Sequence, residues 1–298
     1  MVTRNRVRVG RGIAAALTVL VACVVVAQRR EPALRIVSTL PTATEMLFAL
    51  GLGDRVVGVS EFCRYPPQVA SLPRVGATLH PDFERIATLR PDLVVIADRN
   101  VDFAGRLEAA QIPFVMIPTT TLADVSVATM RIGAAAGIEP HARMVVAGIE
   151  ERLQEIRSRS AAGPRRKVLL ILGRAPGTLT GIVAAGVGSY LNDLIEIAGG
   201  TNVVSGVSAL PYPQLSLESI LRLDPDVIVD TIDMGATEAD RQRQHLESRE
   251  LWQRYRTLTA VRTGRVRAAE TDALFIPGPR VIDVAEWLAD VIHGAVHL

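Results

Sequence analysis

Few residues of this 298-residue sequence could do covalent or metal chemistry, and they lie far apart along it. The two cysteines are Cys23 and Cys63, and the five histidines are His80, His141, His245, His293 and His297. No two histidines have the H-E-x-x-H spacing of a zinc site, and neither a P-loop nor a G-x-S-x-G nucleophile turn occurs. These absences favour binding over catalysis. We therefore predict no catalytic residue, no metal site and no cofactor.

Glu84 and Glu218 are the most informative carboxylates because they recur in one pattern. Residues 83–92 and 217–226 share Glu, Ile, Leu, Pro and Asp at a fixed offset of 134 residues (218 − 84), and each precedes an apolar run. An acid near a helix N-terminus is favoured by the helix dipole, which would explain each glutamate singly. Their repetition indicates two related halves. Two equivalent acids would suit a partner with two equivalent basic patches.

Candidate ligand-binding residues lie in the loops that follow the predicted strands, where open α/β sheets bind their ligands. They are Thr39, Phe62, Tyr65, Leu79, His80, Asp98, Arg99, Arg174, Tyr212, Phe275 and Arg280. Loop aromatics offer large, rigid contact area, although each serves equally well as a loop anchor. His80 is better explained as a solvated or hydrogen-bonded side chain than as a metal ligand. We expect Trp252 and Trp287, which lie in helical patterns, to pack in the core.

Short apolar runs alternate with helical segments, which predicts α/β architecture with mainly parallel sheets. The predicted strands include residues 35–38, 56–59, 93–97, 114–117 and 168–172. The segment 42–45 has the spacing of a capping box and is expected to open a helix. Two helices are predicted at 122–137 and 140–159, and the second is long and amphipathic. We predict an N-terminal lobe at 34–139, a bridging helix at 140–160 and a C-terminal lobe at 166–298.

The first 27 residues have the pattern of a targeting segment, in which a basic stretch precedes an apolar run. Leu20-Val21-Ala22-Cys23 resembles a lipobox with Cys23 as the lipidated residue, whereas cleavage after Ala27 would leave a soluble form. Either route places the folded part in the periplasm or on the outer face of the cytoplasmic membrane, attached to it through the leader or lipid alone. Cys63 would then have no disulfide partner. Without the four leader arginines the net charge of +2 becomes about −2, and no basic stripe suggests nucleic-acid binding.

An ordered series of motifs resembles the class III periplasmic substrate-binding proteins of ABC importers, and most of all their cobalamin-binding members. The series is Arg35-Ile36-Val37-Ser38 with Thr44-Glu45, Val57-Gly58-Val59-Ser60 with Tyr65-Pro66-Pro67, Phe83-Glu84-Arg85-Ile86, Leu89-x-Pro91-Asp92-Leu93-Val94, Ala198-Gly199-Gly200-x-Asn202, Leu210-Pro211-Tyr212-Pro213-Gln214-x-Ser216-x-Glu218 and Gly278-Pro279-Arg280. The resemblance covers residues 34–296. It implies two Rossmann-like lobes joined by a long rigid helix, with modest closure on the ligand.

The resemblance also implies a function. The protein is expected to act as a monomer that binds a corrinoid between its lobes and docks on an ABC permease dimer through Glu84 and Glu218. Phe62 and Tyr212 match aromatic positions of the cobalamin binders, whereas two other such positions hold Thr78 and Ala97.

Other ligands and functions stay open. Ferric siderophores and haem use the same fold. Arg99, Arg174 and Arg280 would serve anionic groups on any of these ligands, and His80 or Tyr65 could bind haem iron. A more distant alternative is an envelope-anchored α/β enzyme or ligand sensor.

Overall fold

The computed structural model describes residues 34–231, 238–269 and 272–294. Cys23 and the rest of the predicted leader therefore lie outside the described residues. The first sheet has four parallel strands in the order β2-β1-β3-β4. These strands are β1 (Ile36–Ser38), β2 (Val56–Val59), β3 (Leu93–Ala97) and β4 (Phe114–Ile117). Every residue of β3 is buried, as the continuous apolar run predicts for a strand covered on both faces.

Four helices belong to the same part of the chain. They are α1 (Pro41–Ala49), α2 (Phe83–Thr88), α3 (Val101–Ala109) and α4 (Leu122–Ala135). Helix α4 begins with a full capping box between Thr121 and Asp124. The capping box expected at 42–45 is wrong, because α1 starts with Pro41 in its first turn and has no side-chain cap. Glu45 instead directs its carboxylate to Arg280, 235 residues further along the chain.

The second sheet is mixed and has the order β10-β9-β5-β6-β8, with β7 paired to β5. Its strands are β5 (Arg166–Gly173), β6 (Ile182–Ala184), β7 (Gly200–Asn202), β8 (Gln214–Leu215), β9 (Val227–Thr231) and β10 (Val266–Ala269). Strands β7, β9 and β10 run parallel to their partners, whereas β6 is antiparallel to both β5 and β8. The helices of this part are α6 (Tyr190–Ile197), α7 (Leu217–Leu223), α8 (Glu238–Gln253), α9 (Thr259–Arg262) and α10 (Val281–His293).

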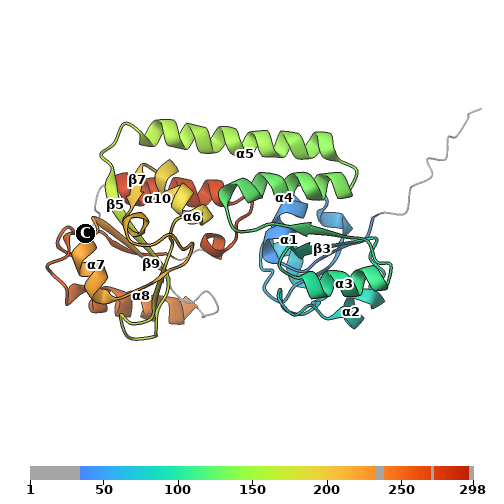
Figure 1. Cartoon of the computed structure of the whole chain (residues 1–298), viewed down its shortest axis with the longest axis horizontal. Helices are drawn as coiled ribbons and strands as arrows, with labels where there is room; N and C mark the ends of the chain where they lie inside the picture. Colours follow the sequence, from blue (N-terminus) through green and yellow to red (C-terminus); the bar gives the residue numbers. More distant parts are fainter. Residues whose placement is uncertain (1–33, 232–237, 270–271, 295–298) are drawn as a thin grey trace, which may run out of the picture. The chain divides into compact units, whose positions relative to one another are not determined.

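Helix α5 (Glu139–Ser160) joins the two sheet-bearing parts as one continuous helix of 22 residues. It contacts α4 from the first part and α6 and α10 from the second, and Figure 1 shows it running alongside α4 and α10. Its buried residues Ile149, Leu153 and Ile156 follow the helical spacing of an amphipathic face. The α/β fold with a long connecting helix is therefore confirmed. The lobe boundaries proposed from the sequence stay a prediction.

The internal repeat has a structural counterpart in the two parts of the fold. In the first, Asp92 accepts a hydrogen bond from the backbone of Arg35 at 2.7 Å, and the Arg35 side chain donates to the carbonyl of Leu89 at 2.8 Å. The second part of the fold has the same two hydrogen bonds, made by the equivalent residues. There Asp226 accepts from the backbone of Lys167 at 2.8 Å, and the Lys167 side chain donates to the carbonyl of Leu223 at 3.0 Å.

The same repeat extends to the backbone between these residues. Arg90 and Asp224, at the same offset of 134 (224 − 90), both have a positive φ, 45° and 42° respectively. A left-handed conformation is uncommon for residues other than glycine, so its recurrence at equivalent positions is a specific match. The matched bonds and backbone show that the two segments form the same helix–turn–strand junction.

Candidate functional site

The predicted aromatic contacts are exposed in both parts of the fold. We call Phe62, Tyr65, Tyr212 and Phe275 the loop aromatics; their exposed fractions lie between 42% and 57%. Phe62 and Tyr65 follow β2, and Phe275 ends a short 3-10 helix after β10. Tyr212 differs from the expectation, because it precedes the edge strand β8 instead of following a strand. Leu79, also predicted, is exposed in the connection between β2 and α2.

A backbone hydrogen bond and an electrostatic interaction link segments of the first part of the fold with segments of the second. The backbone N–H of Tyr190 donates to the carbonyl of Thr120 at 3.1 Å. Burial raises the pKa of Tyr212, and the positive charge of Arg99 opposes that rise. Burial likewise raises the pKa of Tyr190 well above 10, with Tyr212 as a second cause. Arg99 is exposed at the end of β3, so its charge remains accessible to a ligand.

Arg174 is held inside the second part of the fold. Its Nε donates to Asp230 Oδ2 at 3.1 Å, and its Nη1 donates to the carbonyl of Thr178 at 3.1 Å. Asp230 is fully buried and also accepts hydrogen bonds from Ser248 and from the indole N–H of Trp252, at 2.5 and 3.0 Å. The side chain of Arg174 is only 10% exposed. The structure therefore gives this arginine a set of protein partners that sequence analysis did not find.

Arg280 has even more partners within the protein. Its Nε and Nη2 donate to the two carboxylate oxygens of Glu45, and its Nη1 donates to Asp272 Oδ1 at 2.8 Å. Its guanidinium lies over the ring of Tyr65, 4.3 Å from the centroid. Burial alone lowers the pKa of Arg280, but its bonds to Glu45 and Asp272 outweigh burial and raise it. Glu45 and Asp272 carry no local sequence signal for this role, because pairing over such separations is decided by the fold.

The remaining predicted contacts differ in accessibility. Thr39 is fully buried, and its hydroxyl donates to the carbonyl of Val95 at 3.0 Å, so it offers no exposed group to a ligand here. His80 and Asp98 are exposed. Within the described residues, no group of three or more His, Cys, Asp or Glu side chains is placed to hold a metal ion. Trp252 is fully buried and Trp287 packs against the core, as expected.

Cys63 is a buried thiol beside the hydroxyl of Thr44, at 3.1 Å. Burial raises its pKa, which keeps the thiol protonated and unreactive at neutral pH. In this environment Cys63 is a core residue and is not placed to act as a nucleophile.

Glu84 and Glu218 occupy equivalent places on exposed helix surfaces. Each is the second residue of its helix, α2 or α7, and the helices are capped by Asp82 and Ser216. Glu84 is exposed, and the side chain of Glu218 is 79% exposed. Glu218 forms an ion pair with Arg222 one turn along α7, an exposed contact that contributes little to folding. Both acids are therefore available to a partner.

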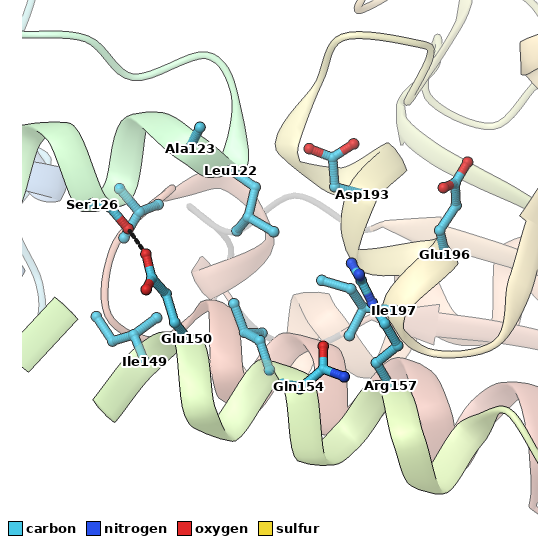
Figure 2. Close-up of a pocket in the computed structure, with 12 residues that line it drawn as sticks. Leu122, Ala123, Ser126, Ile149, Glu150, Gln154, Arg157, Asp193, Glu196 and Ile197 are labelled. Carbon is cyan, nitrogen blue, oxygen red and sulfur yellow. Dashed lines mark hydrogen bonds between the residues drawn. The ribbon is translucent and has the colours of Figure 1, made fainter. Parts of the chain in front are cut away.

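A pocket of about 340 Å³ lies at a place that sequence analysis did not indicate. Figure 2 shows it between helices α4, α5 and α6, with Ser126 donating to Glu150 at 3.1 Å on one side. Its apolar residues include Leu122, Leu153 and Ile197, and its charged residues are Glu150, Arg157, Asp193 and Glu196. Pockets for drug-sized ligands span about 300–1,000 Å³, so this one suits only a small molecule. None of the predicted ligand-binding residues lines it.

No helix that the structure describes is both long and apolar enough to cross a membrane. The sequence profile of a family described as "Periplasmic binding protein" matches residues 36–273. The vitamin B12-binding protein of Vibrio cholerae is 28% identical over 258 residues, covering 86% of this chain and 87% of the relative. An uncharacterized ABC transporter substrate-binding lipoprotein of Bacillus subtilis is 28% identical over 273 residues, covering 89% and 81%. The crystal structure of the periplasmic vitamin B12-binding protein of Vibrio cholerae superposes with a TM-score of 0.71 at 27% identity, covering 88% of this chain and 97% of that one.

Proposed function

The chain belongs to the periplasmic binding protein family, and from this premise we propose that it captures a corrinoid outside the cytoplasm and delivers it to an ABC importer. The relatives support this proposal, because the Vibrio cholerae relative is a vitamin B12-binding protein and the Bacillus subtilis relative is a substrate-binding lipoprotein. The family consists of binding proteins, which agrees with the absence of catalytic motifs from the sequence. The protein works as a monomer that docks on a permease dimer.

We infer the ligand class from the exposure of four aromatic side chains in loops of both sheets. Phe62 and Tyr65 come from the first part of the fold, and Tyr212 and Phe275 from the second. A corrin macrocycle is a broad, flat and largely apolar ring system, and rigid aromatic faces bury such a surface at low entropic cost. We propose that the ligand lies between these two pairs. Arg99, whose charge acts on Tyr212, is an exposed cation that meets its anionic or amide-bearing edge.

The test of ligand class is calorimetric titration of residues 28–298 with cyanocobalamin, haemin and a ferric hydroxamate siderophore. We expect cyanocobalamin to bind with a Kd of about 1 μM or lower, equivalent to about 8 kcal/mol, and the other two at least about tenfold more weakly. The heat-capacity change should be negative, because apolar surface is buried. If haemin or the siderophore binds more tightly than cyanocobalamin, that ligand, and not a corrinoid, is the proposed ligand of the protein. Failure of all three to bind would refute the chelate-binding function.

Anchoring of the protein rests on the leader. We propose that Cys23 is lipidated, because Leu20-Val21-Ala22-Cys23 has the lipobox pattern and the Bacillus subtilis relative is a lipoprotein. Mass spectrometry of the full-length protein expressed with its own leader should find a mature chain that begins with acylated Cys23. The Cys23→Ser variant should leave the membrane fraction. A mature chain that begins at Gln28 would show cleavage after Ala27 and rule out lipidation.

A further inference from the structure

An ion pair between Glu45 and Arg280 joins the two sheet-bearing parts. Glu45 lies in α1 of the first part, and Arg280 precedes α10 in the second. Glu45 is 3% exposed, and the side chain of Arg280 is 14% exposed. The two donors of the guanidinium meet the two oxygens of the carboxylate as a planar fork, which fixes orientation as well as distance. A Cβ at Gly278 would lie 3.4 Å from Glu45 Oε2, so the segment before Arg280 also approaches Glu45 closely.

Arg280 directs one face of its guanidinium at a loop aromatic. With Nε and Nη2 on Glu45 and Nη1 on Asp272, the plane of the group cannot rotate without breaking a hydrogen bond. The ring of Tyr65 lies against this plane at 4.3 Å, a cation–π contact, while 45% of the tyrosine stays exposed. One face of the ring is therefore fixed by Arg280, and part of the side chain is free to meet another molecule.

We propose that Arg280 is a positioning residue of the ligand site: held by Glu45 and Asp272, it fixes the ring of Tyr65 as a rigid aromatic platform. Arg280 does not itself bind the ligand. This differs from the sequence-based expectation that its charge serves anionic groups of the ligand, because its donors are directed into the protein. A ring that is already fixed loses less conformational entropy on binding, so the platform raises ligand affinity. The effect on affinity rests on the proposed function, whereas the effect on the ring does not.

The effect on the ring is tested without a ligand by fluorine NMR of protein labelled with 3-fluorotyrosine. The chain has four tyrosines, and the Tyr65 signal is assigned by its loss in Tyr65→Phe. We expect Arg280→Gln to move and narrow the Tyr65 signal, because the ring becomes mobile, and to leave the signal of Tyr255 in place. Arg152→Gln is the matched control, because Arg152 also bridges two helices, through Glu155 and Glu286, but is far from the loop aromatics in the sequence. An unchanged Tyr65 signal in Arg280→Gln would overturn the proposal.

The effect on affinity is tested by a double-mutant cycle with cyanocobalamin as the calorimetric probe. Tyr65→Ala and Arg280→Gln are each expected to weaken binding about tenfold, and the double variant also about tenfold instead of about a hundredfold, because Arg280 acts through the ring. Additive losses would show that Arg280 acts independently of Tyr65 and would overturn the proposal. If wild-type protein binds no cyanocobalamin, the corrinoid function fails, and the fluorine signal alone decides the role of Arg280.

Removal of Arg280 leaves the buried carboxylate of Glu45 without its main partner, so Arg280→Gln is checked by thermal unfolding first. If that variant does not fold, Glu45→Gln/Arg280→Gln replaces it, because it leaves no unpaired buried charge at this position. The same change of the Tyr65 signal is expected in the double variant. A Tyr65 signal at its wild-type position and width in a folded variant that lacks the guanidinium would contradict the proposal.

Discussion

Reversing the charge of the two acids that we propose as docking residues, Glu84→Arg with Glu218→Arg, is expected to reduce ligand-stimulated transport by at least about tenfold while leaving ligand affinity unchanged. Like charges brought together at an interface are strongly unfavourable, and two reversed sites should repel two equivalent basic surfaces of the permease. Both side chains are exposed, so the free energy of unfolding should change by no more than about 0.5 kcal/mol. The measurements are uptake and ATPase activity in vesicles that carry the cognate importer.

A matched control separates docking from net charge. Glu108 in α3 and Glu151 in α5 are also exposed, and Glu108→Arg with Glu151→Arg changes the net charge by the same amount. This control should transport normally. Transport at the wild-type rate by the Glu84/Glu218 variant, at low and at moderate salt, would refute the docking role. A loss of ligand binding in that variant would instead place the two acids in the ligand site or the fold.

The second large effect that we expect is a loss of affinity for cyanocobalamin when Phe62 and Tyr212 are truncated to alanine. Contacts of large aromatic side chains at the centre of a binding site are worth about 2 kcal/mol or more each, so each alanine substitution should weaken cyanocobalamin binding by about 30-fold. Phe62 is 57% exposed, so its removal creates no core cavity and should leave thermal unfolding almost unchanged. Calorimetric titration of the two single variants and the double variant measures the effect.

Met144 supplies the matched control, because it is a large apolar side chain on α5 that is 66% exposed. Met144→Ala should bind cyanocobalamin like the wild type. Equal affinities in the wild type and the Phe62/Tyr212 double variant would show that these residues are not in the ligand site. An equal loss in Met144→Ala would point to a general effect of surface truncation.

Local sequence patterns predicted the helices and strands of this fold well. They could not predict which side chains pair across long separations in the sequence. The strands 93–97 and 114–117 have the predicted bounds, because an apolar run between turn residues is a local signal. The bridging helix was predicted at 140–160 and observed at Glu139–Ser160, because helical spacing is equally local. The repeat between residues 83–92 and 217–226 was also readable, since it needed only the comparison of two segments.

The sequence did not predict which groups Arg174 and Arg280 contact. Arg174 and Arg280 were both expected to meet a ligand, but each directs its donors at a carboxylate far away in the sequence, Asp230 or Glu45. No spacing rule links such residues, because the sheet order and helix packing decide which loops meet. The same reason explains why the pocket between α4, α5 and α6 was missed: its lining comes from three segments that share no motif.

The separation of Glu45 and Arg280 along the chain has a consequence for the order of events during folding. The pair can form only after the segment that carries Arg280, 235 residues further along the chain, has packed against α1. Until then a carboxylate destined for the interior has no cation beside it, and burying an unpaired charge is strongly unfavourable. Glu45 must therefore stay hydrated, or take up a proton, until the last helix arrives. The final packing of the first helix is thus tied to the completion of the last one.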